Sequence, residues 1–193
     1  MLLVIPPTSK VIGFLTMIHM NYKIVLAGDV GVGKTSLINR FVTGYFADDY
    51  KATIGVNVYT KQLFVDNSEA NLQIWDVAGQ TSFRQFRQRF FSGARGAFLV
   101  FDLTVPTSLD NLHASWIEDI QNNAGEIPLI LIGNKLDLRE SITVSQQDVR
   151  EFLKQHSNIK DHFITSALTG ENVEKAFHKL ASLARSINNR LND

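Results

Sequence analysis

Short, almost wholly apolar runs alternate along this chain with segments whose apolar residues recur at helical spacing. The apolar runs predict buried strands at residues 22–27, 96–104, 128–134 and 162–167. Residues 56–65 and 71–75 predict two further strands, joined as a hairpin by a turn at Asp66-Asn67. Helices are predicted near residues 34–42, 108–122, 146–156 and 171–189, the third with a capping box of Ser145 and Asp148. This alternation indicates a doubly wound α/β sheet, in which ligands bind beyond the carboxyl ends of the strands.

The first 20 residues are apolar but follow no such alternation, and Pro6-Pro7 and Lys10 interrupt them. The unbroken stretch from Val11 is too short to span a bilayer, and neither a positive start nor a small-residue cleavage site is clear. Three interpretations stay open: a disordered or loosely packed arm, a weak membrane-touching segment, or sequence upstream of a natural start at Met20. We therefore separate an N-terminal arm, residues 1–20, from one domain, residues 21–193.

A glycine-rich loop follows the first predicted strand and opens the first predicted helix. Its sequence GDVGVGKT, Gly28 to Thr35, matches the phosphate-binding pattern G-x-x-x-x-G-K-[ST] in the context that the pattern requires. Glycines let several backbone N–H groups point inward at phosphate oxygens, and the helix N-terminus adds its positive dipole. Lys34 would supply a positive charge to the outer phosphates, and Thr35 would offer a hydroxyl to Mg²⁺. This loop, hereafter the P-loop, predicts a nucleotide but not its base, since kinases, ATPases and GTPases all use it.

Residues beyond two other predicted strands limit which nucleotide the site can bind. The sequence LIGNKLDL places Asn134, Lys135 and Asp137 at the end of an apolar run, on the edge where a ligand should lie. A carboxylate at Asp137 can accept two hydrogen bonds from guanine, whereas adenine offers no such paired donors, and such a site discriminates strongly. In IWDVAGQ, Asp76 can hold the Mg²⁺ shell and Gly79 can bring a backbone N–H close to a terminal phosphate. Gln80 can orient an attacking water.

These blocks together resemble the Ras superfamily of small GTPases, most closely its Rab branch, over about residues 21–190. The blocks that carry the resemblance are GDVGVGKTSL, TIGVNVY, LQIWDVAGQ, FFSGARGAFLVFDLT, GNKLDL and TSALTGENVEKAF, in the Rab order. The resemblance implies a P-loop NTPase three-layer sandwich with a six-stranded, mostly parallel sheet, one antiparallel strand and about five helices. It also implies two switches, switch I around Thr53 and switch II around Gln80, which γ-phosphate contacts order and hydrolysis relaxes.

The resemblance assigns further roles. Thr53 is similar to the switch I threonine that reaches Mg²⁺ and the γ-phosphate, Phe46 to the aromatic residue beside the base, and Tyr50 to the switch tyrosine near the phosphates. Ser166 and Ala167 resemble the loop whose backbone touches the guanine oxygen. The expected catalytic residues are Gln80 and Lys34, and the expected magnesium ligands are Thr35, Thr53 and Asp76. The expected nucleotide contacts are Asp29, Val30, Gly31, Val32, Gly33, Lys34, Thr35, Ser36, Phe46, Tyr50, Thr53, Gly79, Asn134, Lys135, Asp137, Ser166, Ala167 and Leu168.

Several positions depart from the pattern of the family. Val30 stands where relatives carry glycine, serine or another small residue, and bulk there crowds the catalytic glutamine and an incoming arginine finger. We therefore expect weak hydrolysis, unless the site repacks. Val77 and Thr81 replace the usual switch II threonine and glutamate, and Leu168 replaces the usual lysine, whose backbone role it can keep. Val58 replaces a phenylalanine of the effector patch, which leaves Trp75 and Phe90; such an aromatic pair is also common in cores.

Composition limits partners and anchors. Lysine and arginine equal aspartate and glutamate at 19 each, so nothing indicates a nucleic-acid partner. The chain has no cysteine, which excludes disulfides, thiolate metal sites and cysteine-linked lipids, and most relatives end in a prenylated cysteine. Four arginines near switch II are expected on a solvated helix face or, as the alternative, a docking surface: Arg84, Arg87, Arg89 and Arg95. We expect a monomeric, cytoplasmic protein, with peripheral membrane contact left open.

The sequence thus predicts a Mg²⁺-dependent GTP/GDP switch that hydrolyses GTP in membrane-traffic-type signalling. Its expected partners are an exchange factor, an activating protein and effectors, through the two switches, Trp75 and Phe90. The alternative is a binding module that stays GTP-bound because Val30 impairs hydrolysis. A third hypothesis, a P-loop small-molecule kinase, is disfavoured by Asn134, Lys135 and Asp137.

Overall fold

A computed structural model describes residues 20–46, 53–66 and 68–192 of the chain. Six strands form one sheet in the order β2-β3-β1-β4-β5-β6. Only the β2–β3 pairing is antiparallel among these neighbours, and the other four pairings are parallel. The strands are β1 (Met20–Ala27), β2 (Val56–Val65), β3 (Ser68–Val77), β4 (Gly96–Asp102), β5 (Leu129–Asn134) and β6 (Ile159–Ile164).

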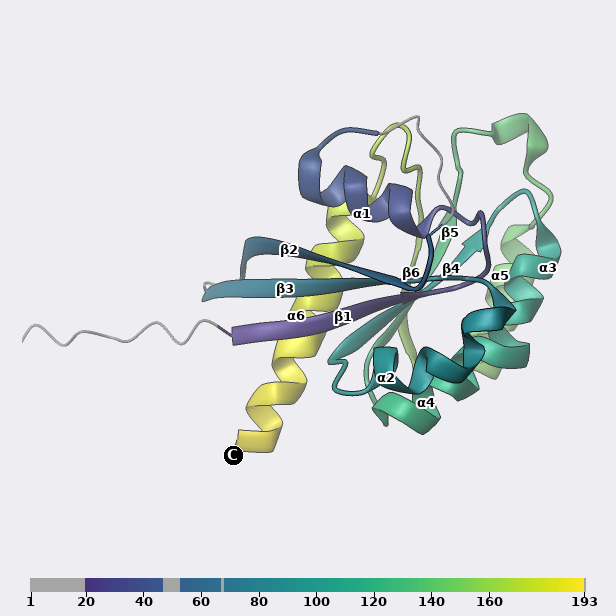
Figure 1. Cartoon of the computed structure of the whole chain (residues 1–193). Helices are drawn as coiled ribbons and strands as arrows, with labels where there is room; N and C mark the ends of the chain where they lie inside the picture. The colour runs from purple at the N-terminus through teal and green to yellow at the C-terminus, as the bar shows by residue number, and fades with distance from the viewer. Residues whose placement is uncertain (1–19, 47–52, 67, 193) are drawn as a thin grey trace, which may run out of the picture.

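Helices cover both faces of this sheet. The helices are α1 (Lys34–Thr43), α2 (Arg87–Phe91), α3 (Pro106–Asn111), α4 (Ile117–Ala124), α5 (Gln146–Gln155) and α6 (Val173–Asn192). Three short turns complete the list: the 3₁₀ helices η1 (Thr81–Phe86) and η3 (Arg139–Ser141) and the π turn η2 (Leu112–Trp116). Helices α1 and α6 pack on one face, and α2 to α5 pack on the other (Figure 1). The predicted three-layer α/β sandwich is therefore confirmed.

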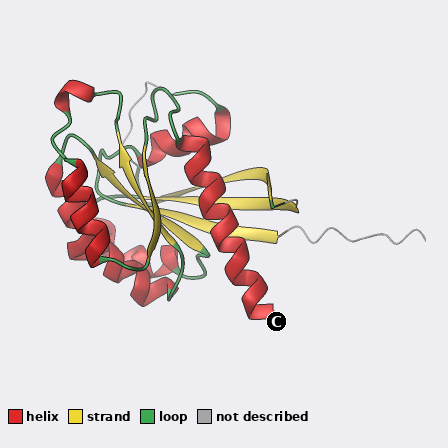
Figure 2. Ribbon diagram, turned by 180° about the vertical axis from the view of Figure 1, so that it is seen from behind, coloured by secondary structure: helices red, strands yellow, loops and turns green. Residues whose placement is uncertain are grey.

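The strands are buried on both faces, which explains their nearly continuous apolar sequence. Along β1, Ile24 and Leu26 face the core under α1 and α6, whereas Val25 and Ala27 face the core under the other helices. On the first face, the rings of Phe41 and Phe177 stack with their centroids 4.0 Å apart. This contact fixes α6 across the sheet beside α1, as the view from behind shows (Figure 2).

Most predicted elements lie within a few residues of the observed ones. The hairpin of β2 and β3 is confirmed, and Asp66 in its turn has a positive φ of 48°. The capping box at the start of α5 is also confirmed, because Ser145 Oγ accepts from the Asp148 N–H and the Asp148 carboxylate accepts from the Ser145 N–H.

Two predicted elements differ from the structure, and two observed ones were not predicted. The sixth strand was predicted at residues 162–167, but β6 ends at Ile164, because the next three residues turn toward the helix α1 side to form a loop. The helix predicted at 108–122 starts earlier, at Pro106, and contains the π turn η2. The short elements η1 and α2 were not predicted, since 11 residues split between two helix types carry no clear apolar period.

Candidate nucleotide site

The P-loop connects β1 to α1 and has the curled backbone that its glycines predict. Gly33 has a φ of 96°, a region that side chains other than glycine rarely adopt. A Cβ placed there would lie 2.2 Å from the Asn134 amide nitrogen. Glycine is therefore required at this position both for its backbone angle and for the close approach of the neighbouring loop.

Lys34 is the first residue of α1 and points back over the P-loop. Its ammonium group donates hydrogen bonds to the carbonyls of Gly28 at 2.7 Å and Asp29 at 2.8 Å. The side chain is only 6% exposed, and burial lowers its pKa from 10.5 to about 8. The carboxylates of Asp76 and Asp29 oppose this shift, and the charge of Arg87 adds to it. The loop thus holds a pre-oriented, poorly hydrated cation.

Three oxygen-bearing side chains meet beside this lysine. The Thr35 hydroxyl donates to Asp76 Oδ2 at 2.6 Å and lies 2.9 Å from the Thr53 hydroxyl, which itself lies 3.2 Å from Asp76 Oδ2. Asp76 is fully buried, and its Oδ1 has no hydrogen-bond partner among the described residues. Oxygen donors with one carboxylate form the ligand set that Mg²⁺ accepts, together with water and phosphate. The cluster therefore fits the magnesium site expected from Thr35, Thr53 and Asp76.

Asn134, the last residue of β5, holds three loops together. Its amide nitrogen donates to the Val32 carbonyl in the P-loop at 3.0 Å. Its amide oxygen accepts from the Ala167 N–H and from the Thr165 hydroxyl, each at 3.2 Å. The side chain is 1% exposed, so these bonds satisfy a buried amide. This residue thus fixes the loop after β5, the P-loop and the loop after β6 relative to one another.

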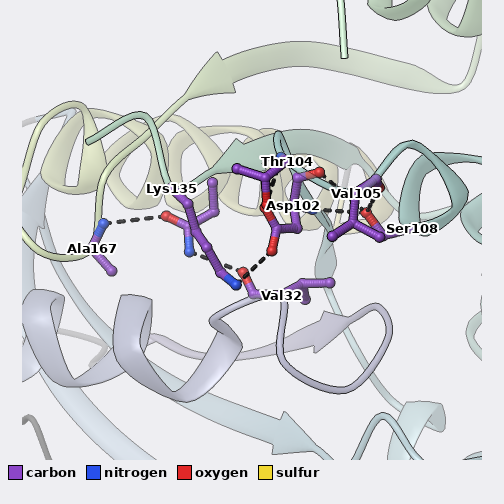
Figure 3. Close-up of polar contacts among 8 residues, drawn as sticks. Val32, Asp102, Thr104, Val105, Ser108, Lys135 and Ala167 are labelled. Carbon is purple, nitrogen blue, oxygen red and sulfur yellow. Dashed lines mark hydrogen bonds and ion pairs between the residues drawn. The ribbon is translucent and has the colours of Figure 1, made fainter. Parts of the chain in front are cut away.

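The other two residues of the predicted base-binding motif are also held. Lys135 has a left-handed φ of 72°, and its ammonium group pairs with Asp102 Oδ2 at the end of β4 (Figure 3). The Asp102 Oδ1 atom accepts from the N–H and the hydroxyl of Thr104. Asp137 Oδ1 accepts a hydrogen bond from the Ser166 hydroxyl. The predicted guanine-binding carboxylate is therefore oriented by the loop after β6.

Switch II begins in direct contact with the P-loop. A Cβ at Gly79 would lie 2.4 Å from the Val30 nitrogen, so glycine is needed for this approach. Gln80 follows it and is half-buried. The Val30 side chain is 49% exposed, so it is not packed into the core but lies at the surface next to this contact.

The remaining predicted contacts fall into three groups. Tyr50 lies outside the described residues. Phe46 packs against the core beneath α1 and is half-buried, and Leu168 is 47% exposed while its carbonyl accepts a hydrogen bond. Gly31 lies in the P-loop and Ser36 in the first turn of α1, and their contacts with the nucleotide stay predictions.

One residue that the sequence did not single out supports the base-binding loop. Arg40, in the middle of α1, donates to the carbonyls of Ala167 and Leu168 and to that of Gly44. Helical spacing places this arginine outside the apolar stripe of α1. Nothing in the local sequence therefore indicated its contact with Ala167, 127 residues further along the chain. A side chain from α1 therefore holds two carbonyl groups of the loop after β6.

The structure places the residues of the expected partner surface and corrects one arginine near switch II. Val58 pairs with Trp75 across β2 and β3 and is 51% exposed, and the Lys23 ammonium group lies 3.7 Å from the centre of the Trp75 ring. Phe90 is half-buried. Arg87, expected on a solvated helix face or a docking surface, is instead 3% exposed and pairs with Asp119 Oδ2. The prediction for Arg87 was wrong because α2 turns this residue inward, onto α4.

A family model described as the Ras family matches residues 23–186. This chain belongs to the Ras family. It is 43% identical over 157 residues to the Ras-related protein RABA4d of Arabidopsis thaliana, a match of 81% of this chain and 69% of the relative. It is 40% identical over 164 residues to the Ras-related protein Rab-7a of Dictyostelium discoideum, covering 82% and 80% of the two chains. The Ras-related protein Rab-1 of Theileria parva is 40% identical over 161 residues, covering 83% and 72%.

The protein is therefore a Rab-like small GTPase, which hydrolyses GTP. Ras-family GTPases use GTP or GDP together with Mg²⁺. This membership gives no support to the alternative in which Val30 leaves a binding module with impaired hydrolysis. Among the helices of the described residues, none combines the length and apolarity that a membrane crossing needs. Residues 1–193 contain no cysteine to carry a lipid.

Proposed function

We propose that this Rab-like GTPase binds Mg²⁺-GTP at the P-loop edge of the sheet and switches between GTP and GDP states in membrane-traffic-type signalling. The observation that carries this proposal is the convergence of Lys34, the Thr35–Thr53–Asp76 cluster and the Asn134–Asp137 loop at one edge. We infer from this convergence that the phosphates, the magnesium ion and the base would share one edge of the sheet.

Each subsite has a physical reason to prefer its group. Lys34, held by two P-loop carbonyls, keeps one N–H for an outer phosphate and gains a counter-ion for a buried charge. The orphaned Oδ1 of Asp76 gains a partner when the metal and its water are present. Asp137, oriented by Ser166, accepts from two adjacent N–H donors of guanine, which adenine lacks.

Hydrolysis is the attack of a water oxygen on the γ-phosphorus, with cleavage of the bond to the β–γ bridging oxygen. Gln80 orients the water, and Lys34 and the P-loop amides stabilise the charge that develops on the phosphates. When bound, Mg²⁺ neutralises charge on the β- and γ-phosphate oxygens. Thr35, Thr53 and Asp76 would hold that ion, and through Thr53 the loss of the γ-phosphate would loosen switch I.

Partner proteins would distinguish the GTP state from the GDP state by the conformation of the switches. We propose that an exchange factor, an activating protein and effectors bind through switch I, switch II and the strip that contains Trp75 and Phe90. Exposed Val58 beside Trp75 supports an apolar contact on β2 and β3. Peripheral association with a membrane would then come from these partners or from the apolar residues 1–20.

Equilibrium binding of a fluorescent guanine nucleotide tests this proposal. Excess GTP should displace the fluorescent nucleotide from the purified chain, whereas excess ATP should not. Removal of Mg²⁺ by EDTA should also release the fluorescent nucleotide. Asp137→Ala should weaken GTP binding about 100-fold or more, because two hydrogen bonds to a charged group are lost. Asp76→Asn should weaken the Mg²⁺ dependence of release, whereas Asp110→Asn, on the exposed side of α3, should change neither property. Displacement by ATP as effective as that by GTP would contradict the proposal.

A further inference from the structure

The helix that follows β4 is interrupted beside the P-loop. Helices α3 and α4 form one continuous helical run, but η2 at Leu112–Trp116 is a π turn. A π turn inserts an extra residue into the helix, costs regular hydrogen bonding and is frequent at functional sites. Here it begins directly after Asn111 and ends at Trp116. Both of these residues contact the P-loop.

Their common partner is the carboxylate of Asp29. Trp116 donates from Nε1 to Asp29 Oδ1 at 3.0 Å, and Asn111 donates from its amide nitrogen to Asp29 Oδ2 at 2.6 Å. The Trp116 side chain is fully buried, so its N–H needs this acceptor. The backbone carbonyl of Asp29 accepts from Lys34. Asp29 therefore joins the phosphate-binding lysine to both ends of the π turn.

Switch II covers a face of the Trp116 ring, whose Nε1 edge donates to Asp29. Arg87, the first residue of α2, places the carbon of its guanidinium group 3.4 Å from the centre of the Trp116 ring. The same guanidinium group pairs with Asp119 at 2.5 Å, one turn further along α4. A planar guanidinium can lie flat on an aromatic ring while its N–H groups pair with a carboxylate, whereas a lysine ammonium has no plane to stack. Trp116 is thus shared between the P-loop and switch II.

Switch II consequently contacts the P-loop at both of its ends. At its start, Gly79 packs on the backbone of Asp29 and Val30, where a Cβ would approach to 2.5 Å of the Asp29 carbonyl carbon. At its end, Arg87 reaches Asp29 through the Trp116 ring. Gln80 lies between these two anchors. A change at Asp29 therefore alters contacts with Gly79 and, through Trp116, with Arg87, on both sides of Gln80 in the sequence.

We propose that Arg87 is a positioning residue that fixes the end of switch II on the Trp116–Asp29 pair and so couples the P-loop to the placement of Gln80. The inference rests on the proposed function, since it assumes that the P-loop holds the phosphates and that Gln80 orients the water. In this proposal Arg87 contacts neither the phosphates nor the attacking water. Its effect passes through Trp116, and the charge that it brings near Lys34 adds to the lowering of the lysine pKa.

A double-mutant cycle in the full chain tests this coupling. Arg87→Met should slow single-turnover GTP hydrolysis roughly 10-fold, because displacement of a positioned group by about 1 Å is costly. It should leave the affinity for GDP nearly unchanged. Asp29→Ala cuts the same connection from the other side, so the double variant should be no slower than the slower single variant. Arg89→Met, two residues along α2 and exposed, is the matched control and should hydrolyse GTP at the native rate.

Fluorescence supplies a readout that altered stability alone would not change. The chain has two tryptophans, so a Trp75→Phe background reports Trp116 alone. Exchange of GDP for a non-hydrolysable GTP analogue should change Trp116 emission, and Arg87→Met should abolish that change. Arg87→Lys keeps the charge without the stacked plane and should behave as Arg87→Met does in both assays, which guards against a variant that merely fails to fold.

Three outcomes would overturn the inference: additive effects in the cycle, native hydrolysis by folded Arg87→Met, or Trp116 emission that ignores the nucleotide. The failure of the proposed function looks different, because the native chain would then neither bind guanine nucleotide selectively nor hydrolyse GTP. A native chain that does both, with Arg87 variants indistinguishable from it, contradicts the coupling alone.

Discussion

At the scale of single residues, Lys34 combines features that rarely occur together. It is a cation with a 6% exposed side chain, held by two carbonyl groups, and its pKa is lowered to about 8 by burial. Near neutral pH the amine is therefore charged but close to titrating. Binding of a phosphate raises its pKa again, so nucleotide binding and protonation of Lys34 are linked.

This linkage predicts a pH dependence of nucleotide affinity. Because the bound form requires protonated Lys34, the affinity for GDP should fall as the pH rises through about 8. Between pH 7.0 and 8.5 the dissociation constant should rise about 4-fold, the ratio of the protonated fractions for that pKa. Fluorescence titration with GDP at fixed Mg²⁺ measures this dissociation constant at each pH.

Lys34→Arg is the control for that measurement, because a guanidinium group stays protonated throughout this range. Its binding should be weaker than that of the native chain but flat with pH. A native profile that is equally flat would show that Lys34 does not titrate in this window.

Single residues also show which parts of the site the sequence could predict. The convergence of Lys34, Thr35, Asp76, Asn134 and Asp137 was predictable, because it depends on short local spacing and on strand ends that meet at one edge of a parallel sheet. The Arg40 contact to the loop after β6 was not predictable, since it joins residues more than 120 positions apart. Arg87 was predicted wrongly because its burial depends on the direction of α2.

At the scale of elements, the π turn and the end of α5 are joined by two histidines. His113 Nδ1 and His156 Nε2 lie 3.1 Å apart, and the His156 ring also packs against Phe152. Burial, and then the neighbouring His113, lower the pKa of His156. Carboxylates line the surface hollows that include His113, namely Asp110, Glu118, Asp148 and Glu151.

This pair predicts that stability falls on mild acidification. The folded pKa of His156 lies below 6.5, so the unfolded chain binds more protons between the two values, and the stability present above pH 6.5 is lost as the pH falls through this window. Urea unfolding at pH 7.5 and pH 5.0 should show a larger loss for the native chain than for His156→Gln. We expect a difference below about 1 kcal/mol, because the pair is partly solvated.

The corresponding control is His178→Gln, which removes an exposed histidine on α6. It should lose as much stability as the native chain between the two pH values. Equal losses in the native chain and His156→Gln would rule out a contribution from the pair.

Elements also differ in how well the sequence predicts them. The strands β4 and β5 and the helix α6 were found within a few residues, because long apolar runs and a sustained helical stripe are strong signals. The π turn gave no such signal, since one extra residue in a turn leaves the apolar pattern almost unchanged on both sides. It nevertheless lies between Asn111, the last residue of α3, and Trp116, its own last residue, which both reach the P-loop.

At the scale of the whole molecule, the sheet order brings the ends of β1, β3, β4 and β5 to one edge. The P-loop follows β1, Asp76 lies at the end of β3, Asp102 ends β4, and Asn134 ends β5. Parallel strands in a doubly wound sheet make this edge a ligand site without any long-range signal in the sequence. The fold class and the site therefore follow from the same alternation of strands and helices.

Single-turnover hydrolysis of GTP by the purified full chain with Mg²⁺ tests the central claim most directly. A chain loaded with GTP should release phosphate in a single exponential, EDTA should abolish the reaction, and Gln80→Leu should slow it while GTP binding persists. A native chain that binds Mg²⁺-GTP yet releases phosphate no faster than Gln80→Leu would contradict the account, as would hydrolysis that does not require Mg²⁺.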